Sequence, residues 1–170
     1  RIWWNGKDKS SAGVAIAISS SLMKEIFHTS HQKLKKGRIS RLSVEDSHGR
    51  KLNIDGAYLT TGSGAYATIK DIEDWHKRRA VDGLTLAMGD FNFVLLPEDR
   101  VERDGEEKPD ADEKQAAVWN KLWSHHLHEV YQPSSTYSHS LRSSRIDRIY
   151  TSMDTTESTG WNLEARILHL

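Results

Sequence analysis

An apolar run that stops at a glycine constrains the fold of this chain most. Residues 84–88 read Leu-Thr-Leu-Ala-Met, and Gly-Asp-Phe-Asn follows at 89–92. A short apolar segment bounded by a turn signal is typical of a buried strand, and the glycine permits a sharp turn or a close backbone approach. The pattern therefore predicts that Asp90 and Asn92 lie together at the carboxyl end of a strand, where open α/β sheets usually place their chemistry.

Two other segments also place polar residues at the ends of expected strands. Tyr58 ends the run 51–58, and Ser-Arg-Ile-Asp-Arg-Ile-Tyr at 144–150 leads into an expected strand at 146–151. A strand-end tyrosine or aspartate taken alone is more often structural than functional. The order and spacing of the three segments together form a specific pattern.

The remaining pattern predicts one domain of the α/β class. Strands are expected at 13–18, 38–45, 51–58 and 135–140, and the turn sequence at 46–49 joins two of them into a hairpin. Helices are expected at 65–80 and after Asp112, which forms a capping-box pattern with Gln115. Residues 97–112 read as a surface loop, and 161–170 as the start of a further strand. This mixture predicts an α/β sandwich of two mixed β-sheets packed face to face with outer helices.

Composition narrows the kinds of site that the chain can carry. The 24 Lys and Arg residues balance the 24 Asp and Glu residues, so no overall field attracts nucleic acid. A basic cluster could line a phosphate track or form a solvated turn, and it consists of Lys33, Lys35, Lys36, Arg38 and Arg41. The absence of cysteine excludes disulfides and thiolate metal sites. No signal peptide or membrane span is visible, and we expect no membrane partner.

These segments resemble the endonuclease/exonuclease/phosphatase superfamily, whose members include pancreatic deoxyribonuclease, the apurinic-site endonucleases and the endonuclease domains of LINE-type retrotransposons. Gly-Asp-Phe-Asn matches the family signature at Asp90 and Asn92. The later block matches a family strand at Ser144 and Asp147, and Tyr58 matches a strand-end tyrosine. The resemblance covers 13–149, and Ser-Arg-Ile-Asp-Arg-Ile-Tyr is most similar to retrotransposon-type members.

The resemblance also implies that 1–170 is a single partial domain. The family begins with strands that carry its main metal ligand, a glutamate, and closes with a Ser-Asp-His strand, and neither has a match here. His169 has no aspartate before it and is not matched to the family histidine. We therefore expect an incomplete sandwich whose cleft opens toward the missing strands, and a chain that is inactive or nearly so as it stands.

Phosphodiester hydrolysis needs an activated water and neutralised phosphate oxygens, which carboxylates and a divalent metal supply. Mg²⁺ prefers oxygen ligands, and Mg²⁺ or Mn²⁺ is the cofactor that the resemblance implies. It further implies that Asp90 activates water and contacts the metal, that Asn92 and Tyr58 contact the phosphate, and that Asp147 orients the family's histidine. Candidate substrate-binding residues are Ser144, Arg145, Arg148, Lys36 and Arg38, the last four by charge.

Several functions remain open at this point. The first is a retroelement endonuclease that nicks DNA, with DNA as the partner of the complete domain. Such an enzyme could have a reverse transcriptase domain in the parent polyprotein and could act in the nucleus. The alternatives are a phosphatase or phospholipase of the same fold, or a decayed fragment without catalysis, because a fold alone does not decide function.

Overall fold

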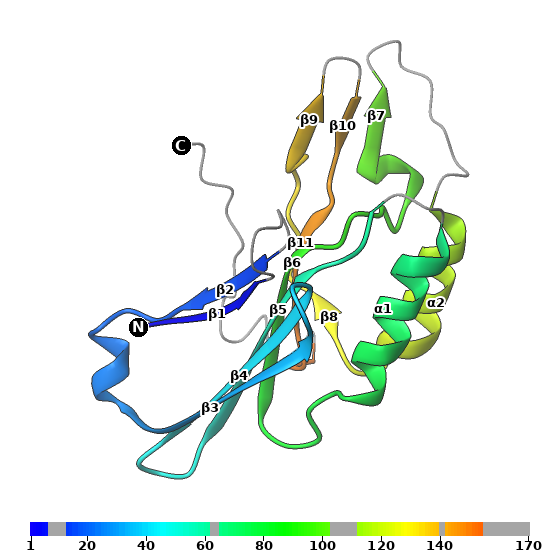
Figure 1. Ribbon diagram of the computed structural model, residues 1–170. Coiled ribbons are helices and arrows are strands. Elements are labelled where there is room, and N and C mark those ends of the chain that lie inside the picture. The colour runs from blue at the N-terminus through cyan, green and yellow to red at the C-terminus, as the bar shows by residue number, and fades with distance from the viewer. Residues whose placement is uncertain (7–12, 62–64, 103–111, 140–141, 155–170) are drawn as a thin grey trace.

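The computed structural model describes residues 1–6, 13–61, 65–102, 112–139 and 142–154 (Figure 1). At its centre is a six-stranded sheet in the order β3-β4-β5-β6-β11-β8. The strands are β3 (Ile26–Lys35), β4 (Ile39–Asp46), β5 (Lys51–Tyr58), β6 (Leu84–Asp90), β11 (Asp147–Thr151) and β8 (His128–Glu129). Neighbouring strands run antiparallel except for β5 and β6, which are parallel, so the sheet is mixed.

Two helices lie side by side on one face of this sheet (Figure 1): α1 (Ala65–Lys77) and α2 (Glu113–Trp123). Their apolar residues recur at helical spacing, so each helix turns one stripe toward the sheet. The core between the layers is aromatic, with Trp119 stacked on Trp123 at 5.4 Å between ring centroids. Trp75 is buried among them and donates a hydrogen bond from Nε1 to Asp55 Oδ2 at 2.7 Å. Burial of each such side chain contributes about 1.5–3 kcal/mol.

The opposite face of the sheet carries a two-stranded antiparallel ribbon of β1 (Ile2–Gly6) and β2 (Gly13–Ala17). Its apolar residues pack on β4 in a second cluster, which contains Ile16, Ile18, Leu42 and Val44. Asn5 is fully buried and donates from Nδ2 to the carbonyls of Lys35 and Ile39, both at 2.9 Å. Its Oδ1 accepts the Gly37 N–H at 3.0 Å, so Asn5 fixes the turn between β3 and β4.

A small three-stranded sheet, in the order β7-β10-β9, projects beyond the end of the main sheet (Figure 1). It consists of β7 (Arg100–Glu102), β10 (Arg142–Ser144) and β9 (Tyr137–His139). Two short 3₁₀ turns, η1 (Leu22–Lys24) and η2 (Pro97–Asp99), complete the elements of the described chain. None of its helices is long and apolar enough to cross a membrane.

The predicted sandwich class is confirmed, although both helices lie on one face and the second layer is only a ribbon. The hairpin and both helices occur where the sequence predicts them. The expected surface loop is wrong in part, because residues 97–102 form η2 and β7. The expected capping bond is also wrong. The Asp112 carboxylate instead accepts the Val94 N–H at 3.0 Å and an Arg100 N–H at 2.7 Å. The strand expected at 161–170 lies outside the described residues.

Candidate active site

Three predicted site residues form a row across adjacent strands. The parallel register of β5 and β6 places Tyr58 beside Asp90, and the antiparallel register of β6 and β11 places Asp147 on the other side of Asp90. Because neighbouring strands lie about 4.8 Å apart, the backbone of the row spans about 10 Å. Residues 57, 87 and 150 belong to the core under the helices. Alternation along each strand therefore directs the row toward the opposite face.

Gly89 allows the strands to meet closely at this row. Its φ is +141°, and a Cβ atom there would lie 1.9 Å from the carbonyl oxygen of Ala57 on β5. An L-residue would therefore suffer both a strained backbone and a clash with another backbone. The glycine predicted to permit a close backbone approach does so one residue before Asp90.

Asn92 holds the turn that presents Asp90. It adopts a φ of +55°, a left-handed conformation that asparagine tolerates better than most residues. Its backbone N–H donates to Asp90 Oδ1 at 2.8 Å, and its Nδ2 donates to the carbonyl of Leu59 at 2.9 Å. Asn92 thus fixes Asp90 through the main chain and ties this turn to the segment that follows β5.

Burial raises the pKa of the Asp90 carboxyl to about 6, while the N–H of Asn92 lowers it and the negative charge of Asp147 raises it. A carboxyl with a pKa near neutrality can gain and lose a proton under working conditions. Paired carboxylates with a raised pKa are also common at functional sites. The raised pKa therefore makes Asp90 a candidate proton acceptor.

We expect Asp90→Asn to change how stability depends on pH. A carboxyl whose pKa is raised on folding favours the folded state below its unfolded pKa, and this advantage is lost as pH rises from about 4 to about 6. The variant should therefore match the parent at pH 4 and have a higher Tm at pH 7. Thermal unfolding of both proteins at the two pH values measures this difference. If the variant and the parent differ in Tm by the same amount at pH 4 and at pH 7, the raised pKa is contradicted.

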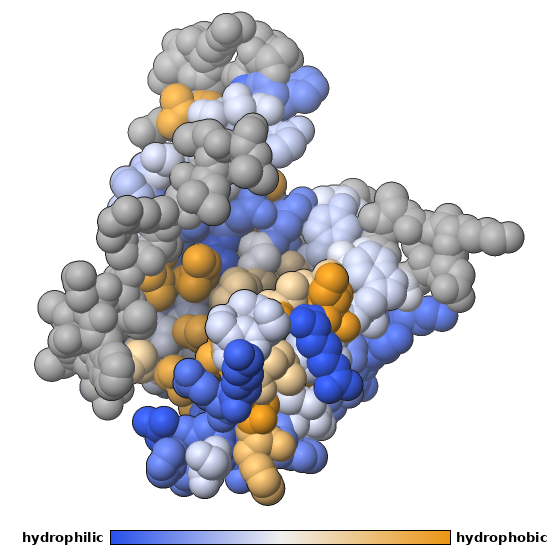
Figure 2. All heavy atoms as spheres, turned by 90° about the vertical axis from the view of Figure 1, so that its left-hand side faces the viewer, coloured by the Kyte–Doolittle hydropathy of each residue, from blue (hydrophilic) through white to orange (hydrophobic). Residues whose placement is uncertain are grey.

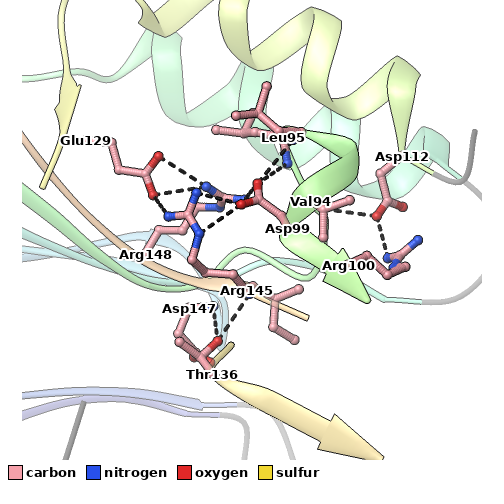
Figure 3. A network of polar contacts seen from close by, with 12 residues as sticks. Val94, Leu95, Asp99, Arg100, Asp112, Glu129, Thr136, Arg145, Asp147 and Arg148 are labelled. Atoms are coloured by element: carbon pink, nitrogen blue, oxygen red, sulfur yellow. Dashed lines mark hydrogen bonds and ion pairs between the residues drawn. The ribbon is translucent and has the colours of Figure 1, made fainter. Parts of the chain in front are cut away.

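Thr136 is a site residue that sequence reasoning missed. Its Oγ1 accepts the backbone N–H of Asp147 at 2.9 Å and that of Ile146 at 3.2 Å, as Figure 3 shows for Asp147. The hydroxyl fixes the first residue of β11 beside Asp90. Only the structure identifies this role, because the sequence does not show which group a threonine hydroxyl in a predicted strand will hydrogen-bond.

Arg38 contacts Tyr58 directly. Its guanidinium carbon lies 4.7 Å from the centre of the Tyr58 ring, and its Nη1 is 3.5 Å from the carbonyl oxygens of Tyr58 and Leu59. Lys36 is exposed on the same turn, which Asn5 holds. Two of the predicted phosphate-binding cations are therefore at the edge where Tyr58 ends β5.

The other two predicted cations, Arg145 and Arg148, lie inside the protein (Figure 3). Arg148 is 1% exposed and donates to Asp99 Oδ2 at 2.5 Å and to Glu129 Oε1 at 3.0 Å. Arg145 donates to Asp99 Oδ1 at 2.8 Å and also pairs with Glu129. These contacts support a structural role and not the phosphate binding predicted from charge.

Asp99 corrects a second expectation, because the sequence placed it in a solvated acidic loop and it is 5% exposed. Burial alone would raise the pKa of Asp99, but the hydrogen bonds and charges of Arg148 and Arg145 hold it below its usual value. Ser144, predicted to contact substrate, is also buried and lies three residues before Asp147.

The row offers two carboxylates to a divalent metal. Mg²⁺ is commonly held by one or two carboxylates together with water and substrate phosphates, so Asp90 and Asp147 fit it. The described residues contain no group of three or more His, Asp or Glu side chains able to hold a metal.

A hollow of about 470 Å³ adjoins Tyr58 and Asp90 between β2, β5 and β6. It lies on the face that Figure 2 shows, where apolar and charged residues surround a recess.

No protein-family model matches the sequence, and no curated protein matches it. Solved structures do match. An AP endonuclease from Archaeoglobus fulgidus aligns with a TM-score of 0.51 and 13% identity over 69% of this chain and 53% of its own. A humanized D. rerio TDP2 aligns with a TM-score of 0.55 and 14% identity over 92% of this chain and 62% of its own. The chain has the endonuclease/exonuclease/phosphatase fold. It spans less than two thirds of the length of either structure.

Proposed function

We propose that this chain is part of a divalent-metal-dependent phosphodiesterase. The observation that carries the proposal is the row of Tyr58, Asp90 and Asp147 across β5, β6 and β11, with burial raising the pKa of Asp90 to about 6. Two carboxylates and a phenol at one sheet edge suit an attack by water on a phosphodiester. The fold, which is that of a solved AP endonuclease, supports this assignment.

We further propose that the substrate is DNA and that the parent protein is a retroelement endonuclease. The form Ser-Arg-Ile-Asp-Arg-Ile-Tyr at 144–150 supports this origin through its resemblance. The turn that presents Lys36 and Arg38 beside Tyr58 supports binding of a phosphate backbone, because exposed cations follow such a backbone without reading its sequence.

Each residue of the row has a distinct role in this proposal. Asp90 accepts a proton from the attacking water, and Asp147 lies beside it as a second oxygen ligand. The Asn92 amide and the Tyr58 hydroxyl donate hydrogen bonds to the phosphate or to the leaving oxygen. A metal bound by Asp90 and Asp147 would neutralise the phosphate oxygens and lower the pKa of a bound water.

The 170 residues alone should have little or no activity, because the described residues supply two carboxylates to the metal and no third ligand. Members of a catalytic unit fail together when one is missing. A nicking assay on supercoiled plasmid with Mg²⁺ or Mn²⁺ tests this, and clear nicking that EDTA abolishes would contradict it.

The same assay on a longer protein, in which this chain is joined to strands that carry the family's glutamate and its Ser-Asp-His motif, tests the catalytic assignment. Asp90→Ala and Asn92→Ala should each reduce the nicking rate by about 10²-fold or more. Lys70→Ala, an exposed change on α1, serves as the control and should leave the rate unchanged. Rates within threefold of the unsubstituted longer protein for both variants would remove these residues from the mechanism. Hydrolysis of phosphomonoesters without nicking would assign the phosphatase alternative.

A further inference from the structure

A second hollow lies on the helix-bearing face of the sheet, and the function proposed above does not use it. Its volume is about 480 Å³, which falls within the range of small-molecule sites. Its floor comes from β4 and β5, one side from the edge strand β3, and the other side from residues 78–82, which link α1 to β6. Asn53 in its floor lies five residues before Tyr58, so the hollow is ~16 Å along the strand from the carboxylate row.

The hydrogen-bond acceptors in the floor are already occupied. Arg41 is buried and donates to both oxygens of Asp55, at 2.7 and 2.6 Å, and to the Arg78 carbonyl at 2.7 Å. Ser43 donates to Asn53 Oδ1 at 2.7 Å. A ligand in the hollow would therefore meet a floor whose carbonyl and carboxylate oxygens are shielded by protein donors.

The rim of the hollow is cationic. Arg78 and Arg79 are exposed at the end of α1, and Lys33 is exposed on the edge strand. Arg78 Nη1 donates to the Leu34 carbonyl at 2.5 Å, and Arg79 Nη1 donates to the His76 carbonyl at 3.4 Å. Within the described part of the chain, most of the five N–H donors of each guanidinium therefore remain available to a ligand. Among the described lining residues Asp82 is the one carboxylate, and Lys51 pairs with it at 2.8 Å.

We propose that this hollow binds a phosphate group, held by the guanidinium forks of Arg78 and Arg79. Arginine forks match the oxygens of phosphate and form charge-assisted hydrogen bonds with them. The phosphate could belong to a small phosphorylated molecule or to the backbone of a polynucleotide. The site does not depend on the carboxylate row, so its failure would leave the proposed phosphodiesterase untouched.

The test uses the 170-residue chain and two probes, pyrophosphate by calorimetry and a labelled single-stranded oligonucleotide by fluorescence anisotropy. The double variant Arg78→Ala/Arg79→Ala should weaken binding by about tenfold or more. The matched control is Lys70→Ala/Lys77→Ala, which removes the same charge from exposed positions of α1 outside the hollow. At 0.15 M salt the control should change binding by less than about twofold.

Each outcome decides the proposal. Weakened pyrophosphate binding assigns a small phosphorylated ligand, and weakened binding of the oligonucleotide alone assigns a nucleic-acid backbone. If the arginine double variant does not fold, Arg79→Glu replaces it, because among the described residues the Arg79 side chain donates to a single carbonyl, that of His76. Equal weakening by the two double variants, or no binding of either probe to the parent, would overturn the site.

Discussion

Gly89→Ala should destabilise the protein by about 3 kcal/mol or more, because the new Cβ would combine backbone strain with a clash. The alanine would have to adopt a φ of +141° and would place its Cβ 1.9 Å from the Ala57 carbonyl oxygen. Relief requires β5 and β6 to separate at the position before Tyr58 and Asp90. Urea unfolding measures the loss of stability.

Gly49→Ala is the control that separates strain from clash. Gly49 has a φ of +77°, and nothing lies within 4 Å of its ideal Cβ position. This variant should therefore lose only the cost of a left-handed backbone, about 1–2 kcal/mol. If Gly89→Ala lowers the free energy of unfolding by no more than Gly49→Ala does, β5 and β6 do not lie as close at the row as the structure shows.

Asp99→Ala should be comparably severe, because it would leave two buried arginines with one carboxylate between them. Asp99 accepts hydrogen bonds from Arg145 and Arg148 (Figure 3). Its Oδ2 also accepts the Leu96 N–H at 3.1 Å. Removing one partner of a buried ion pair typically lowers the free energy of unfolding by about 3–5 kcal/mol, because the remaining charge is uncompensated. The free energy of unfolding in urea is the measurement.

Asp82→Ala provides the matched comparison. Its carboxylate also pairs with a cation, Lys51 at 2.8 Å, but both side chains are largely exposed. Exposed pairs contribute about 0–1 kcal/mol. Asp99→Ala should therefore lower the free energy of unfolding several times more than Asp82→Ala does. Equal costs would show that the Asp99 network is solvated and does not hold β11 in place.

Local sequence patterns predicted well the sheet edge that carries Tyr58, Asp90 and Asn92. The strand before Gly89, the turn at Asn92 and the hairpin that ends at Tyr58 depend on residues close in sequence, and the structure places them as expected. Strand pairing then brings Asp147 to Asp90, which the family resemblance implied and local spacing alone could not show. The roles of these residues in catalysis stay predictions.

The sequence did not reveal the elements whose partners are distant. Arg148 and Asp99 are 49 positions apart, and nothing in either neighbourhood indicates that they pair. Strand β3 was missed because it is an edge strand with mostly polar residues, and its Phe27 is 81% exposed, so no apolar alternation marks it. Charge alone predicted phosphate binding by Arg145 and Arg148, since the sequence does not show which cations are buried.

We propose that Asp90 and Asp147 form one divalent-metal site at the end of β6, and NMR of Mn²⁺ binding tests this most directly. The paramagnetic ion should broaden the backbone amide signals of residues nearest the row, namely 58, 90–92, 146 and 147, before others. The test does not require activity, so it applies to the 170-residue chain.

Asp90→Asn should abolish this selective broadening, whereas Asp82→Asn, at an exposed carboxylate away from the row, should leave it unchanged. Mg²⁺ should compete with Mn²⁺ and should lower the pKa of Asp90 from about 6, because a nearby cation favours the carboxylate. Broadening centred elsewhere on the protein, or broadening at the row that persists in Asp90→Asn, would contradict the assigned site.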